Sequence, residues 1–182
     1  MGPPERDPMS SEPAWHPLAE SDQEPTTAPS AEGLLAVDLG LKTGLAYFTR
    51  QGRLVYARTR KFSSRARLKN AIPRLLADAQ GVSWLVLEGD SRLAQAWIAC
   101  AKKSGINHLQ VTPEQWRSYA LLPRERRSGV DAKDAAKRLA LEVMRRHGTP
   151  RHSPLQDDAA EAVLIGQWAL ARLGWTDAPG VV

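Results

Sequence analysis

The chain has 182 residues, of which 42% are hydrophobic, so it is long enough for one domain with a substantial core and too short for two ordinary ones. It contains no run of about 18 apolar residues that could cross a membrane, and its N-terminus lacks the layout of a signal peptide. A single cysteine, Cys100, excludes an internal disulfide and fits a reducing compartment. These features predict a soluble, cytoplasmic protein.

The first 32 residues differ in composition from the rest. They hold seven of the 13 prolines, seven acidic residues and one basic residue, Arg6. Such a segment cannot bury enough apolar surface to offset the entropy lost on folding, so residues 1–32 are predicted to be a disordered acidic tail. We expect one domain over residues 33–176 and a short C-terminal tail over residues 177–182.

Without the acidic tail the chain is strongly basic. Residues 33–182 hold 24 Lys and Arg against 13 Asp and Glu, a surplus of 11 positive charges. A surplus of this size suits a polyanionic partner such as nucleic acid, because Lys and Arg contacts to phosphates release counterions. Charge alone is equally consistent with a merely basic soluble protein.

Three short apolar runs, over residues 34–37, 45–48 and 54–57, open the predicted domain. Turn sequences separate them, so they are expected to form an antiparallel meander of strands. Helical spacing follows over residues 63–79, where Pro73 is expected to confine the regular helix to one side of itself.

Strands and helices alternate in the rest of the chain. Residues 84–87 and 109–111 are predicted strands, with a helix between them that Ser91 caps and Gly105 ends. Three helices are predicted after the last strand: one that begins at Thr112-Pro113, a long one over residues 131–146 and a nearly all-apolar one over residues 155–173. This order predicts an α/β domain with a mixed sheet.

Two of the apolar runs end on a carboxylate. Asp38 follows residues 34–37, and Glu88 follows residues 84–87. Acidic side chains are rarely buried without a partner, so two of them at the ends of neighbouring strands would indicate a shared cation. Taken singly, each would more often be an ordinary strand-end acid that faces solvent.

The start of the final helix carries three further acids. Asp158 and Glu161 are three residues apart and share a helix face, as do Asp157 and Glu161 at four apart. Capping and the helix dipole favour acids at a helix N-terminus without any function. Glu161, however, lies among alanine, valine, leucine and isoleucine, where an ionised carboxylate needs a partner.

Convergent carboxylates would supply only oxygen ligands, which select hard cations such as Mg²⁺ or Mn²⁺. Two such ions about 3.5 to 4 Å apart can activate water and stabilise the leaving oxygen in phosphodiester hydrolysis. We therefore assign Asp38, Glu88, Asp158 and Glu161 as catalytic metal ligands, with two ions per site and with Asp157 as the alternative to Asp158.

The order of these motifs resembles the RuvC-like resolvases, a family of the ribonuclease H-like superfamily. The likeness rests on segments in the same order: Asp38-Leu39-Gly40 with Thr43-Gly44-Leu45-Ala46, Glu88, Thr112-Pro113-Glu114-Gln115-Trp116-Arg117, and Asp158-Ala159-Ala160-Glu161-Ala162. It covers residues 33–173. It implies a ribonuclease H-like fold, with a five-stranded mixed sheet flanked by helices.

The resemblance also implies an activity. It suggests a metal-dependent, structure-selective endodeoxyribonuclease that cuts branched DNA such as Holliday junctions, usually as a homodimer. Leu39 and Glu161 stand where many resolvases have proline and aspartate. Only Gly89 and Asp90 separate Glu88 from Ser91, so the longer loop that carries an aromatic wedge in bacterial resolvases is absent.

Several basic residues are candidates for nucleic-acid binding. Lys133 lies where the family has a basic residue near the scissile phosphate, so we assign it a catalytic role as well as a binding role. A solvated loop or helix start would explain the same charges. The residues expected to contact the DNA backbone are Arg117, Arg124, Arg126 and Arg127.

Other functions remain open at this stage. A related ribonuclease H-like family processes ribosomal RNA and shares the Asp-x-Gly opening. Asp38-Leu39-Gly40 also resembles the phosphate loop of actin-like ATPases, but this chain is too short for the two domains that those proteins need. A non-catalytic nucleic-acid-binding module is the alternative that is not an enzyme.

Overall fold

The computed structural model describes residues 32–150 and 153–176. The strands are β1 (Gly33–Leu39), β2 (Lys42–Thr49), β3 (Leu54–Lys61), β4 (Val82–Gly89) and β5 (Asn107–Val111). The helices are α1 (Arg65–Asp78), α2 (Ser91–Lys103), α3 (Pro113–Ala120), the short 3-10 helix η1 (Pro123–Arg126), α4 (Gly129–Arg146) and α5 (Asp157–Arg172). Apart from Glu32, both expected tails lie outside the described residues.

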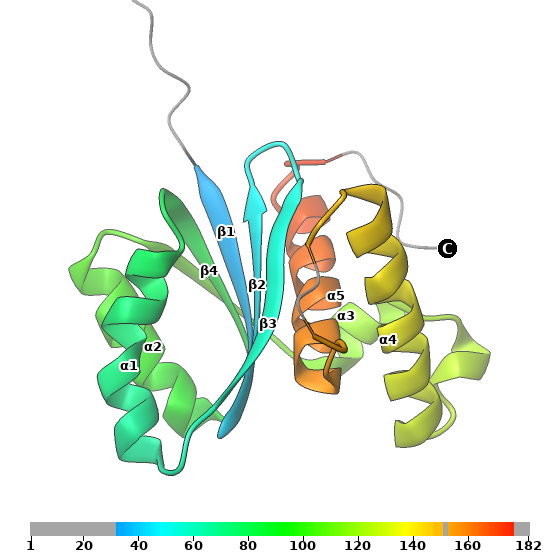
Figure 1. The fold of residues 1–182 in the computed structure, drawn as a ribbon, viewed down its shortest axis with the longest axis horizontal. Helices are drawn as coiled ribbons and strands as arrows, with labels where there is room; N and C mark the ends of the chain where they lie inside the picture. The colour runs from blue at the N-terminus through cyan, green and yellow to red at the C-terminus, as the bar shows by residue number, and fades with distance from the viewer. Residues whose placement is uncertain (1–31, 151–152, 177–182) are drawn as a thin grey trace, which may run out of the picture.

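The five strands form one mixed sheet in the order β3-β2-β1-β4-β5. β1, β2 and β3 pair in antiparallel fashion, as the predicted meander requires, while β1–β4 and β4–β5 are parallel. Figure 1 shows α1 and α2 on one face of the sheet and α3, α4 and α5 on the other. The predicted five-stranded mixed sheet with flanking helices is confirmed.

Each face of the sheet has its own hydrophobic core. Trp97 and Phe48 are fully buried on opposite faces: Trp97 packs in the core under α1 and α2, and Phe48 in the core under α3, α4 and α5. Ten of the 16 residues of α5 are buried, as its apolar sequence predicts. No helix within the described residues is long and apolar enough to span a membrane.

One row of residues crosses the whole sheet near the C-terminal ends of β1 and β4. From β3 to β5 its members are Thr59, Gly44, Asp38, Glu88 and Val111. The parallel pairing of β1 and β4 puts Asp38 directly beside Glu88. The two strand-end acids of the sequence therefore lie at the same edge of the sheet.

Gly44 allows α5 to reach this row. A Cβ atom at Gly44 would lie 1.9 Å from the backbone carbonyl oxygen of Asp158 and 3.0 Å from the backbone nitrogen of Ala159. Real atoms cannot approach so closely, so only glycine permits the first turn of α5 to lie against β2. Eight residues along the helix, Gly166 contacts Phe48 in the same close way.

The prediction that Pro73 confines the helix to one side is wrong, because α1 runs from Arg65 to Asp78 with Pro73 inside it. Proline removes the N–H that would donate to the carbonyl of Lys69, four residues earlier. Both Pro73 and Lys69 are exposed, so water can bond the freed carbonyl while the buried face of the helix keeps its contacts.

The prediction that Ser91 caps α2 is also wrong. Asp90 is the N-cap, and its side chain accepts hydrogen bonds from the backbone N–H groups of Arg92 and Leu93. Aspartate and serine are both favoured N-caps, so the sequence alone does not choose between these neighbours.

Two further boundaries differ from the prediction. α4 begins at Gly129 rather than Asp131, because Ser128 caps it by accepting from the Asp131 N–H. The expected basic loop before it contains η1, and α5 begins at Asp157 rather than Leu155.

We expect Gly44→Ala to destabilise the protein by about 1 to 3 kcal/mol, because the added methyl group must push α5 away from β2. Chemical denaturation measures this change. Gly129→Ala is the matched control, since a Cβ there meets nothing within 4 Å. An equal effect of the two substitutions would show that α5 does not depend on the close contact at Gly44.

Candidate metal centre

Asp38 and Glu88 point to the face of the sheet that α5 covers. Side chains alternate along a strand, and Ala36 and Val86, two residues before each acid, belong to the core under α5. The two carboxylates therefore lie between the sheet edge and the first turns of α5.

Gly89 ends β4 directly after Glu88. Its φ of 111° is a conformation that other residues rarely adopt, and a Cβ there would lie 2.9 Å from the carbonyl oxygen of Leu39. The chain can thus turn away at Gly89 and start α2 at once, with Asp90 as its cap. Glu88 therefore lies at a tight junction between a strand and a helix.

Glu161 joins these two acids from the second turn of α5. Asp38, Glu88 and Glu161 each offer a carboxylate oxygen, and these atoms lie within 4.8 Å of one another. Within the described parts of the chain this is the one group of possible metal ligands found. Glu88 and Glu161 are only 7% and 8% exposed, and Asp38 is partly buried. We call these three residues the acid cluster.

Burial and mutual repulsion make it hard to ionise the acid cluster. The pKa of Asp38 is raised to about 8, first by burial and then by the negative charges of Glu161, Glu88 and Asp158. The pKa values of Glu88 and Glu161 are also raised, in both cases mainly by burial. A positive charge among the three carboxylates would favour their ionised forms.

Arg117 supplies part of that positive charge. Its guanidinium nitrogen lies 3.7 Å from Oε1 of Glu161, and its side chain is 31% exposed. The guanidinium also lies over the Trp116 ring, 5.1 Å from the ring centroid. Arg117 thus approaches the acid cluster from α3, and its charge lowers the pKa of Asp38, Glu88 and Glu161. From the sequence, Arg117 is expected only as a contact to DNA.

The acid cluster fits a hard divalent cation. All three side chains provide oxygen ligands, the donor type that Mg²⁺ and Mn²⁺ prefer. Glu161 Oε1 is buried and has no hydrogen-bond partner among the described residues, since the Arg117 nitrogen is at ion-pair rather than hydrogen-bond distance. A buried acceptor without a donor is costly, and a metal ion would satisfy it.

The other two acids of the α5 start have different surroundings. Asp158 is partly buried and lies close enough to raise the pKa of Asp38, but its carboxylate is outside the group of three. Its role as a fourth ligand stays a prediction. Asp157 forms an ion pair with Lys137 of α4 at 3.5 Å and is likewise outside the group.

The predicted DNA-binding residues of η1 and α4 are all exposed. Lys133 lies close enough to the acid cluster for its charge to lower the pKa of Glu161. Arg126 donates a hydrogen bond of 2.9 Å to the Ser118 hydroxyl. Arg124 and Arg127 make no ion pair with the described residues.

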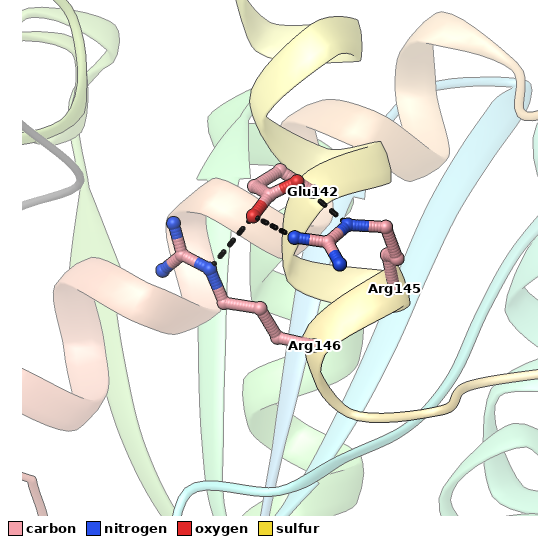
Figure 2. Close-up of polar contacts among 3 residues, drawn as sticks. All are labelled: Glu142, Arg145 and Arg146. Carbon is pink, nitrogen blue, oxygen red and sulfur yellow. Dashed lines mark hydrogen bonds and ion pairs between the residues drawn. The ribbon is translucent and has the colours of Figure 1, made fainter.

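Other cations already have partners within the protein. Figure 2 shows Glu142 near the end of α4, where it accepts hydrogen bonds of 2.7 Å from Arg145 and 3.0 Å from Arg146. These hydrogen bonds lower the pKa of Glu142 to about 2. The two arginines are therefore less available to phosphate groups than the unpaired cations are.

Comparison with solved structures identifies similar folds in Thermus thermophilus RuvC. One, in complex with Holliday junction substrate, has a TM-score of 0.54 and 18% identity and covers 79% of this chain and 97% of that chain. A second RuvC structure from the same organism has a TM-score of 0.51 and 18% identity. The match covers 78% of this chain and 96% of that chain. The fold of this chain is ribonuclease H-like. No family model and no curated protein sequence matches it.

In the metal-free protein we expect stability to fall as pH rises from about 4 to 8. Asp38 has a pKa of 3.8 in the unfolded chain and of about 8 in the folded protein, so the folded protein keeps this proton to a higher pH. The folded state therefore binds more protons in this window, and each rise in pH favours unfolding. In EDTA, the melting temperature of Asp38→Asn should vary less with pH than that of the parent. Asp134→Asn, which removes an exposed carboxylate, is the control. Parallel pH profiles for the parent and Asp38→Asn would contradict the assignment.

Removal of Arg117 should destabilise the metal-free protein at pH 8. Arg117→Ala leaves Glu161 without its cation, at a cost of about 1 to 3 kcal/mol. Mn²⁺ should stabilise Arg117→Ala more than it stabilises the parent, because the ion supplies the missing positive charge. Thermal unfolding in EDTA and in Mn²⁺ measures both effects.

Arg145→Ala is the matched control for Arg117→Ala. It removes an exposed ion pair, which should contribute little to stability, and its response to Mn²⁺ should equal that of the parent. If Arg117→Ala behaved like this control, Arg117 would have no part in holding the acid cluster.

Proposed function

We propose that the protein is a metal-dependent endonuclease that cuts phosphodiester bonds in DNA, with branched DNA such as a four-way junction as its preferred substrate. The observation that carries this proposal is the acid cluster: three carboxylates within 4.8 Å, at the edge of a ribonuclease H-like sheet. Their raised pKa values are typical of functional sites rather than of ordinary surface acids.

In this proposal Asp38, Glu88 and Glu161 hold one or two Mg²⁺ or Mn²⁺ ions, with Asp158 as the further ligand. When bound, these ions supply the Lewis-acid chemistry that activates water and stabilises the leaving oxygen. The chain itself holds the ligands in place: Asp38 and Glu88 by strand pairing, and Glu161 by the close contact of α5 with β2. The protein therefore contributes a rigid, partly buried set of oxygen ligands.

Cations near the acid cluster would bind the negatively charged substrate. Lys133 is exposed and near Glu161, so it can contact the phosphate that is cut. Arg124, Arg126 and Arg127 extend the positive surface along η1 and the start of α4. Arg117, in contact with Glu161, is better placed to position that carboxylate than to bind the DNA backbone.

The preference for branched DNA rests on the structural likeness to a RuvC that was solved with Holliday junction substrate. The likeness spans 97% of that chain, so no large part of its fold is missing here. In this protein, α2 starts directly after its cap Asp90, which leaves no loop between β4 and α2 for an aromatic wedge. Symmetric cutting of a junction needs two sites, so the proposal includes a homodimer.

We expect the protein to nick a labelled four-way DNA junction in Mg²⁺ or Mn²⁺, and not in EDTA. Linear duplex, flap DNA and structured RNA serve as comparison substrates. Asp38→Asn should abolish cutting and still bind DNA, because it removes a ligand and retains the cationic surface. Asp134→Asn, an exposed acid on α4, should cut like the parent.

The products separate the alternatives. Paired symmetric nicks on the junction support a resolvase. Metal-dependent cutting of the other DNA substrates instead would support a nuclease and exclude the preference for branched DNA. Selective cutting of RNA would favour the RNA-processing alternative. DNA binding without cutting, in any metal, would favour the non-catalytic binding module, and full activity of Asp38→Asn would overturn the metal-ligand assignment.

A further inference from the structure

Two lysines face each other at the ends of β2 and β3. Lys42 and Lys61 are paired across the two antiparallel strands, and both are exposed. Neither forms an ion pair with any residue in the described ranges. Like charges directly opposite each other on neighbouring strands destabilise a sheet. No acidic side chain among the described residues offsets the repulsion between the two lysines. An anion bound from outside the protein would offset it.

The pair lies on the same face of the sheet as the acid cluster. Lys42 is two residues from Gly44, and Lys61 is two residues from Thr59, and both of these belong to the row that contains Asp38. Since side chains alternate along strands, residues two apart share a face. Both lysines are thus about 7 Å beyond the row of the acids along the strands.

A cavity of about 490 Å³ adjoins Lys61 on this face. It lies between β3 and the chain that leads into α5. Its lining includes Thr59, Lys61, Leu155, Gln156 and Ala159. The volume is in the range of small-molecule binding sites. Thr59 lines the cavity, and its buried Oγ1 has no hydrogen-bond partner among the described residues.

Two nearby arginines, by contrast, have acidic partners within the protein. Arg58 is paired with Asp78 at 3.2 Å, and Arg65 with Asp90 at 3.1 Å. These arginines have internal counter-ions, as Arg145 and Arg146 do in Figure 2. Lys42 and Lys61 differ from these arginines, because each lies opposite a like charge and has no acidic partner among the described residues.

We propose that Lys42 and Lys61 bind phosphate groups of the DNA strand on the β3 side of the acid cluster, with an adjacent nucleotide in the cavity at Thr59. Arg117 approaches the cluster from the other direction, on α3, which follows the edge strand β5. The DNA strand would then cross the sheet edge from the lysine pair to the acid cluster. This inference rests on the proposed function, because it requires DNA as the ligand.

The test is the salt dependence of DNA binding. Each phosphate contact contributes about 0.7 to 0.9 to the slope of log affinity against log salt concentration. Lys42→Gln/Lys61→Gln should therefore lower the magnitude of this slope by about 1.4 to 1.8. The measurement is fluorescence anisotropy of a labelled four-way DNA junction in EDTA over a series of NaCl concentrations.

Lys102→Gln/Lys103→Gln is the matched control, because it removes the same charge from exposed lysines at the far end of α2. α2 starts beside the acid cluster, so its last turn lies at the opposite edge of the sheet. The slope of this control should equal that of the parent. Thermal unfolding without DNA checks the fold, and Lys42→Gln/Lys61→Gln should be at least as stable as the parent since it removes a repulsion.

The outcomes separate this inference from the function on which it rests. A reduced slope for Lys42→Gln/Lys61→Gln alone supports the lysine site. Equal slopes for the parent and both variants would overturn it, and metal-dependent cutting by the parent would then still support the nuclease. If the parent neither bound nor cut DNA at low salt, both the inference and the proposed function would be wrong.

Discussion

The close packing of α5 on the sheet is the constraint on which the candidate site depends. Gly44 has no side chain, so the backbone of Asp158 and Ala159 can lie directly against β2. Only at this separation does Glu161, one turn further along α5, reach the carboxylates of Asp38 and Glu88. A contact between two backbones thus determines the geometry of a charged site.

This packing creates an electrostatic problem that the fold solves only in part. Three carboxylates share a buried space, where repulsion and loss of hydration oppose their ionisation. Arg117 offsets some of the negative charge on Glu161. Below a pH of about 8, a proton on Asp38 removes a further negative charge from the acid cluster. Glu161 Oε1 still lacks a hydrogen-bond partner within the described chain. A divalent cation held by the three carboxylates would offset the remaining cost.

The positive charges are divided into two kinds. Some arginines, such as Arg145 and Arg146, pair with acids on the surface of the same helix and have a structural explanation. Others, including Lys133, Lys42 and Lys61, are exposed near the acid cluster without such partners. A basic surface around a buried acidic centre suits a polyanion, because the cations would attract its phosphate groups toward the acid cluster.

Local patterns in the sequence were sufficient to predict the strands and helices and to single out the three acids of the acid cluster. Alternation and runs of apolar residues locate strands, so Asp38 and Glu88 could be placed at strand ends before their neighbours were known. Glu161 stood out because it interrupts an apolar helix. Pro73 and the cap of α2 were predicted wrongly, because the cost of an exposed proline and the choice between two good caps depend on solvent contact and on backbone angles.

The sequence by itself determined the order of strands and helices, the basic charge and the acids that converge, since each of these follows from local periodicity and composition. Only the tertiary structure decided which charges meet. Strand register placed Lys42 opposite Lys61, and helix packing placed Arg117 against Glu161 and Asp157 against Lys137. These pairs join residues far apart in the chain, and their partners are set by three-dimensional packing rather than by any pattern of neighbouring residues.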